Sequence, residues 1–176
     1  MINLLTVSRV LLLVPLVWVL AATRIPSWGA FAIFIAAGIT DLVDGYLARK
    51  LKQTSPFGAM LDQICDKIFI ISTLTAMAAV GLLQNLMLVP VLLIIVREFA
   101  VAGLREYAAQ NARAILVDKL GKIKTVTQFA AITLMLIPAN GIEFIVLLNH
   151  AGAALLWVAA LLGVYSGARY FKLLPK

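Results

Sequence analysis

The stretch from Asp41 to Lys67, DLVDGYLARKLKQTSPFGAMLDQICDK, decides the fold of this chain. It contains two pairs of aspartates, one pair spaced three residues apart and the other four apart. Residues at these spacings share one face of an α-helix, so each pair points in one direction. The segment between the pairs turns the chain back, which brings two helix ends to the same depth. The sequence therefore predicts that four carboxylates converge: Asp41, Asp44, Asp62 and Asp66.

The rest of the chain is strongly apolar. Of its 176 residues, 63% are hydrophobic and 13% are charged, whereas a typical soluble domain is about half apolar and about a quarter charged. We therefore predict an all-α integral membrane protein. One crossing takes about 20 residues, so the length predicts six transmembrane helices that form a single domain over residues 1–176. The expected spans are 4–22, 28–46, 62–83, 86–107, 123–138 and 149–171, and the apolar segment 141–148 either extends a neighbouring span or lies at the membrane interface.

Basic residues are distributed unevenly among the loops. The loops after the second and fourth expected spans and the C-terminal tail are rich in lysine and arginine, whereas the other loops contain almost none. By the positive-inside rule both termini are expected to be cytoplasmic, which places the four aspartates near the cytoplasmic side. We therefore expect a polar cavity at that side, and the like charges of its carboxylates predict that it contains metal. The net charge of +7 is dispersed between apolar spans. This pattern favours anionic membrane lipids or phosphorylated substrates as partners and not nucleic acid.

Four carboxylates so close together need cations. A single aspartate at the centre of a membrane helix costs about 2.5–3.5 kcal/mol, and neighbouring like charges repel one another. A divalent metal relieves both costs. Carboxylate oxygens favour hard ions such as Mg²⁺, Mn²⁺ or Ca²⁺ over zinc. The sequence therefore predicts a metal site formed by the aspartates.

Small residues accompany the acidic cluster. Gly45 and Ala48 lie on or beside the face of the first aspartate pair, and Gly58 lies one turn before the second pair. A surface without large side chains leaves room for a bulky ligand, although glycine in a membrane helix also serves helix packing. Arg49 supplies the positive charge that phosphate groups need, or acts as a topological anchor.

These residues form a recognisable pattern. The run D-x-x-D-G-x-x-A-R, followed by eight residues and then G-x-x-x-D-x-x-x-D, resembles the signature of the CDP-alcohol phosphotransferase family. The resemblance implies a six-helix membrane enzyme, usually a homodimer, with two metal ions, Mg²⁺ or Mn²⁺, held by the aspartates. It implies that Asp41, Asp44 and Asp62 are chiefly metal ligands and that Asp66 is both a ligand and the general base. Residues implied to line the site of the CDP moiety are Gly45, Ala48, Arg49 and Gly58.

Two further stretches are unusually polar for this chain. They read VREFAVAGLREYAA, residues 96–109, and DKLGKIKTVTQ, residues 118–128. A buried arginine needs an anion. The alternatives are a structural pairing of each arginine with the glutamate that follows it, although adjacent helical residues diverge, and lysines that only mark topology. We predict a pocket for the phosphate of the acceptor substrate, formed by Arg97, Arg105, Lys122 and Lys124.

Both stretches resemble the corresponding segments of bacterial family members that make phosphatidylglycerophosphate. The opening NLLTVSR resembles their first helix, where Asn3, Thr6 and Arg9 recur every three residues and face the same cavity. The implied reaction joins CDP-diacylglycerol and sn-glycerol 3-phosphate and yields phosphatidylglycerophosphate and CMP. This is a step of phospholipid biosynthesis at the inner, cytoplasmic membrane of a bacterium.

Other functions stay open at this point. The same chemistry with serine or an inositol phosphate as acceptor is one alternative, but serine has no phosphate for the basic pocket. A divalent cation transporter is another, and it predicts acidic residues on both sides of the bilayer without neighbouring arginines. A structural or assembly protein is a third, and it predicts no loss of function when Asp66 is neutralised.

Overall fold

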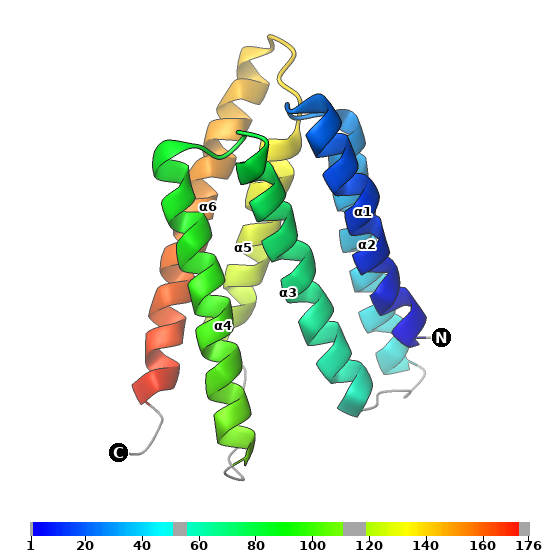
Figure 1. Cartoon of the computed structure of the whole chain (residues 1–176), viewed down its shortest axis with the longest axis vertical. Helices are drawn as coiled ribbons and strands as arrows, with labels where there is room; N and C mark the ends of the chain where they lie inside the picture. Colours follow the sequence, from blue (N-terminus) through cyan, green and yellow to red (C-terminus); the bar gives the residue numbers. More distant parts are fainter. Residues whose placement is uncertain (1, 51–55, 111–118, 173–176) are drawn as a thin grey trace. The chain divides into compact units, whose positions relative to one another are not determined.

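The computed structural model describes residues 2–50, 56–110 and 119–172, and all its regular elements there are helices (Figure 1). The prediction of an all-α chain is confirmed for these residues. The chain divides into two compact units. The first comprises Met1–Leu83 with Leu136–Ile145, and the second comprises Gln84–Met135 with Val146–Lys176.

The first unit is built on three helices, α1 (Ile2–Thr23), α2 (Trp28–Lys50) and α3 (Pro56–Ala79). Helix α1 packs against both α2 and α3 (Figure 1). The rings of Phe34 on α2 and Phe69 on α3 stack with their centroids 5.4 Å apart, and both side chains are buried. This apolar packing fixes the three helices against one another and so positions the polar residues that they carry.

Helix α3 differs from its predicted bounds, residues 62–83. It begins six residues earlier, at Pro56, because proline suits the first turn of a helix, where its missing N–H is not needed. It ends earlier, at Ala79, because Gly81 adopts a left-handed conformation with φ 85°. The N–H groups of Gly81 and Leu82 then donate to the carbonyls of Ala78 and Met77. This is a Schellman motif, which ends the helix.

The second unit contains η1 (Asn85–Met87), α4 (Leu88–Gln110), α5 (Lys119–Leu136) and most of α6 (Glu143–Lys172). Of the apolar segment 141–148, residues 143–148 form the first part of α6, so the segment extends this helix and does not form a separate element. A turn with Gly141 at φ 80° precedes the helix, and Glu143 in its first turn complements the positive end of the helix dipole. The sixth helix therefore starts before the expected residue 149.

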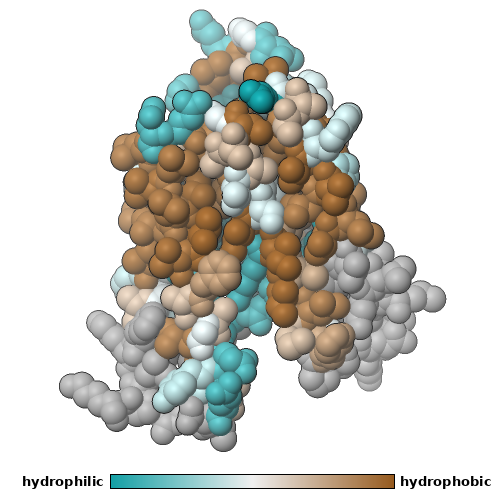
Figure 2. All heavy atoms as spheres, viewed as in Figure 1, coloured by the Kyte–Doolittle hydropathy of each residue, from teal (hydrophilic) through white to brown (hydrophobic). Residues whose placement is uncertain are grey.

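Large apolar side chains lie on the surface of the helices as well as in their core. Along α4, Leu92, Val96 and Phe99 are exposed, and Figure 2 shows apolar side chains over the middle stretches of the helices. Buried polar side chains include Arg9, Glu98 and Lys124. Among the described residues two helical stretches, Asn85–Gln110 and Glu143–Tyr170, are long and apolar enough to cross a membrane. Shorter apolar helices cover Ser8–Thr23 and Trp28–Val43.

Candidate active site

Three of the predicted aspartates converge in the first unit. Asp41 lies on α2, and Asp62 and Asp66 lie one turn apart on α3. One carboxylate oxygen from each lies within 4.8 Å of the others, an arrangement that could hold a metal ion. The expectation that the end of one helix and the start of the next bring their carboxylates together is confirmed for these three residues.

Arg9 lies in the middle of this acidic cluster. It comes from α1, and its Nη2 atom is 2.8 Å from Oδ1 of Asp41 and 2.7 Å from Oδ1 of Asp62. Its Nη1 atom pairs with Oδ1 of Asp66. Arg9 was predicted only to face a cavity. The structure instead gives it an ion pair with each of the three carboxylates.

The cluster has the composition that a divalent metal requires. Its oxygens are hard ligands, the type that Mg²⁺, Mn²⁺ and Ca²⁺ prefer. The carboxylates outnumber the single guanidinium by two charges, so the group of Arg9 and its three partners can accept a divalent cation. The Asp62 side chain is 48% exposed, whereas that of Arg9 is 3% exposed. Asp62 is therefore accessible to a ligand although it is paired with the buried arginine.

Other predicted residues of this site lie outside the described side chains. The α2 backbone carries four of them, Asp44, Gly45, Ala48 and Arg49, and the α1 backbone carries Asn3 and Thr6. Gly58 is described, lies one turn before Asp62 on α3, and is partly exposed. The roles predicted for these residues stay predictions.

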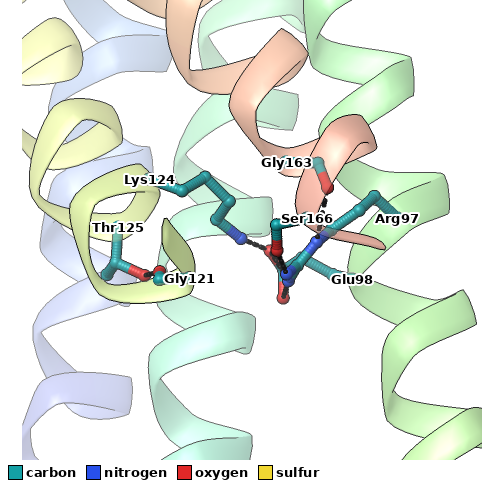
Figure 3. A network of polar contacts seen from close by, with 7 residues as sticks. All are labelled: Arg97, Glu98, Gly121, Lys124, Thr125, Gly163 and Ser166. Atoms are coloured by element: carbon teal, nitrogen blue, oxygen red, sulfur yellow. Dashed lines mark hydrogen bonds and ion pairs between the residues drawn. The ribbon is translucent and has the colours of Figure 1, made fainter. Parts of the chain in front are cut away.

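The second unit holds a buried polar cluster in which basic side chains outnumber the acidic one. Residues of three helices form it (Figure 3). Lys124 on α5 forms an ion pair with Glu98 on α4. Arg97, also on α4, donates from Nε to the carbonyl of Gly163 at 3.1 Å and from Nη2 to Oγ of Ser166 at 2.9 Å, both on α6. Arg97 Nη1 lies 3.3 Å from Glu98 Oε1. Two cations thus share one carboxylate away from water.

Glycines on α6 make room for these long side chains. A Cβ atom added to Gly163 would lie 3.2 Å from Cδ of Lys124, and one added to Gly167 would lie 3.3 Å from Cγ of Arg97. Two glycines four residues apart lie on the same face of a helix, so the spaces that their missing side chains leave adjoin one another. The aliphatic stems of the two cations therefore pack directly against the α6 backbone.

The remaining predicted basic residues are placed differently. Arg105 on α4 lies over the ring of Tyr170, 5.6 Å from its centroid, a cation–π contact. Its Nε atom is buried without a hydrogen-bond partner among the described residues. Lys122 is exposed, since residues two apart on a helix face different directions. Gln128, one turn beyond Lys124, also buries a side-chain nitrogen without such a partner.

The sequence leaves open a structural pairing of Arg97 with the glutamate that follows it, and the structure shows that Arg97 and Glu98 come into contact. The sequence does not predict the other connection within this cluster. The main partner of Glu98 is Lys124, 26 positions away in the sequence. The only signal was the presence of a glutamate in an apolar span, because a buried acid needs a cation. Ser166, an ordinary small residue in the sequence, gave no signal.

Two helices long and apolar enough to cross a membrane, and an acidic cluster that could hold a metal ion, are features expected of a membrane-associated, metal-dependent enzyme. The model of the CDP-alcohol phosphatidyltransferase family matches residues 1–165, and the chain belongs to this family. A CDP-diacylglycerol--glycerol-3-phosphate 3-phosphatidyltransferase of Rickettsia typhi is 36% identical over 174 residues, which cover 97% of this chain and 94% of the relative.

Plant relatives are similar over a smaller share of their own length. CDP-diacylglycerol--glycerol-3-phosphate 3-phosphatidyltransferase 1, chloroplastic/mitochondrial, of Arabidopsis thaliana is 43% identical over 159 residues, 82% of this chain and 53% of the relative. A cardiolipin synthase (CMP-forming) of Oryza sativa is 39% identical over 165 residues, 82% of this chain and 49% of the relative. The chain thus spans about half the length of these two plant proteins and nearly all of the Rickettsia protein.

Proposed function

We propose that this chain transfers the phosphatidyl group of CDP-diacylglycerol to sn-glycerol 3-phosphate and releases phosphatidylglycerophosphate and CMP. Its family supports the donor chemistry, and a relative of nearly the same length carries the name of this activity. The observation that carries the proposal is the convergence of Asp41, Asp62 and Asp66. Transfer from a diphosphate needs concentrated positive charge, and these carboxylates are suited to binding a metal that provides it.

The proposed reaction makes one bond and breaks one bond at phosphorus. A hydroxyl oxygen of glycerol 3-phosphate bonds to the phosphorus of the phosphatidyl group, and the bond from that phosphorus to the CMP oxygen breaks. The hydroxyl proton passes to a general base, which we assign to Asp66. Its side chain is 42% exposed, so a substrate hydroxyl can approach it, as general base catalysis requires.

We assign the metal site to Asp41, Asp62 and Asp66 together with Asp44. Mg²⁺ or Mn²⁺ fits their oxygen ligands, and the family signature implies two ions. When bound, the metal supplies positive charge to the diphosphate of the donor and to the departing CMP. We assign the CDP moiety to the residues of the signature that surround the aspartates, namely Gly45, Ala48, Arg49 and Gly58.

The phosphate of glycerol 3-phosphate is assigned to Arg97 and Lys124, with Arg105 and Lys122 as further candidates. Arg97 and Lys124 are buried and share the single carboxylate of Glu98, so these three side chains carry an excess of positive charge. Buried positive charge favours an anion. Gln128 adds a buried nitrogen that has no hydrogen-bond partner among the described residues. A phosphorylated acceptor fits this cluster better than serine does.

We further propose a multi-pass arrangement with six spans, cytoplasmic termini and an inner-membrane location, and a homodimer as the assembled form. The two long apolar helices and the exposed apolar side chains support a membrane location. The family match runs through the residues of both compact units, which supports one functional domain. Fractionation of the native cells and reaction of cysteines introduced near each terminus with a membrane-impermeant reagent test the location and the topology.

An acceptor assay tests the function directly. Purified protein is incubated with labelled CDP-diacylglycerol, Mg²⁺ and, in separate reactions, glycerol 3-phosphate, inositol phosphate, serine or phosphatidylglycerol. We expect CMP and labelled phosphatidylglycerophosphate with glycerol 3-phosphate. CMP release only with another acceptor would contradict the assignment of the acceptor. Metal flux into proteoliposomes without any CMP release would favour a transporter.

A further inference from the structure

The buried position of Arg9 suggests a specific role in the acidic cluster. Its side chain is 3% exposed, whereas those of Asp41, Asp62 and Asp66 are 42–48% exposed. The guanidinium therefore approaches the carboxylates from the interior of the unit. The three carboxylates keep exposed surface that a ligand can reach.

Arg9 contacts one oxygen of each carboxylate. All three ion pairs are made to the Oδ1 atoms of Asp41, Asp62 and Asp66. The guanidinium is thus paired with each carboxylate through Oδ1. A carboxylate that accepts a hydrogen bond through one oxygen can still bind a metal through the other, and such outer hydrogen bonds orient metal ligands in many proteins.

The geometry of the contacts depends on the shape of the guanidinium. Nη2 bridges Asp41 on α2 and Asp62 on α3, while Nη1 holds Asp66. The Nε atom is buried without a hydrogen-bond partner among the described residues, whereas both terminal nitrogens contact the acids. A planar group with a rigid fork can hold three carboxylates at fixed directions, whereas a lysine ammonium is a single point charge on a flexible stem.

We infer that Arg9 is a positioning residue, which holds one oxygen of each of the three carboxylates so that the other oxygens are oriented for a divalent cation. The inference rests on the proposed function, because that function gives the cluster its metal. Arg9 also repels a cation through its own charge, and the two effects are separable. Arginine and lysine carry the same charge, so exchanging one for the other changes the orientation of the acids and leaves the repulsion in place.

The test is the affinity for Mn²⁺, measured by electron paramagnetic resonance on purified, substrate-free protein. We expect Arg9→Lys to bind Mn²⁺ roughly tenfold more weakly than the wild type, at the low end of the 10–100-fold loss that follows removal of an outer-shell partner. Arg9→Gln is expected to bind more weakly as well. Equal affinity of Arg9→Lys and wild type, or tighter binding by Arg9→Gln, would overturn the inference.

A matched control is Arg24→Lys, which makes the same exchange at an exposed position just after α1. It is expected to bind Mn²⁺ as the wild type does. The experiment also separates the inference from the proposed function. If the wild type binds no Mn²⁺, the proposed metal dependence fails. If the wild type binds Mn²⁺ and Arg9→Lys binds it equally well, only the role of Arg9 fails.

A second measurement uses the wild-type chain and does not depend on how the variants fold. An experimental structure with Mn²⁺ bound should show the Arg9 guanidinium still paired with Asp41, Asp62 and Asp66. A guanidinium that has withdrawn from all three carboxylates would show that Arg9 competes with the metal and does not position its ligands.

Discussion

The guanidinium of Arg9 on α1 donates a 2.7 Å hydrogen bond to the carboxylate of Asp62 on α3, and 53 positions separate the two residues in the sequence. This bond ties the first helix to the third at the acidic cluster. It also shows that the cluster is a three-helix feature, since Asp41 on α2 pairs with the same nitrogen. The proposed chemistry depends on this packing as much as on the aspartates themselves.

The first prediction concerns Asp62 as a metal ligand. Asp62→Asn keeps the size of the side chain but removes its charge, so we expect the rate of CMP release to fall by about 10²–10³-fold, the usual effect of losing one electrostatic contribution to a transition state. The measurement is CMP release with saturating glycerol 3-phosphate. Glu143→Gln is the control, because Glu143 is exposed at the start of α6. A full rate for Asp62→Asn would remove this residue from the site.

The second prediction concerns Asp66 as the general base. Asp66→Asn cannot accept the proton of the acceptor hydroxyl, so kcat should fall by about 10²–10⁴-fold. At saturating Mg²⁺ the KM for CDP-diacylglycerol should change little. Steady-state kinetics of the purified variant separate the two constants. A raised KM with an unchanged kcat would assign Asp66 to donor binding instead.

The third prediction concerns the buried pair of Glu98 and Lys124. Lys124→Met leaves the Glu98 carboxylate buried without its main cation, which should lower the free energy of unfolding by about 3–5 kcal/mol. Adding Glu98→Gln to this variant should restore most of the loss. Thermal denaturation of both single variants and of the double variant forms the cycle. Additive losses would show that the two side chains do not stabilise one another.

The fourth prediction compares two helical glycines. A Cβ atom at Gly152 would lie 2.9 Å from the carbonyl oxygen of Ala131 and 2.8 Å from Cγ of Met135, whereas one at Gly103 would meet no atom within 4 Å. Gly152→Ala should therefore destabilise the protein by about 1–3 kcal/mol. Gly103→Ala should be neutral or stabilise it by up to about 1 kcal/mol, since alanine favours helix. Thermal denaturation that ranks the two variants in the opposite order would contradict the packing of α5 and α6.

The helical fold and the acidic cluster are in part predictable from the sequence. Apolar composition predicts helices, and the spacing of Asp62 and Asp66 places both on one helix face, because both signals are local. The approach of Asp41 to them is predictable because the short segment between the two aspartate pairs turns the chain back. The start of α3 was missed although Pro56 is a typical first-turn residue. Its end was missed because a Schellman turn at Gly81 interrupts a stretch that stays apolar.

The partners within each cluster were less predictable. The sequence predicts that Arg9 faces a cavity with Asn3 and Thr6, because the three recur every three residues. Its contact with the acids depends on how α1 packs against α3. The pairing of Glu98 with Lys124 depends in the same way on how α4 and α5 pack. Contacts between distant segments follow from the fold as a whole, so residue spacing alone does not predict them.

The most direct test of the central claim is the metal dependence of phosphatidyl transfer by the purified wild-type chain. Glycerol 3-phosphate and CDP-diacylglycerol are supplied, and the lipid product is identified by mass spectrometry before and after treatment with EDTA. We predict that phosphatidylglycerophosphate forms with Mg²⁺ or Mn²⁺, disappears on chelation and returns when either ion is restored. Formation of the product at an unchanged rate after chelation, or its absence under all these conditions, would contradict the account.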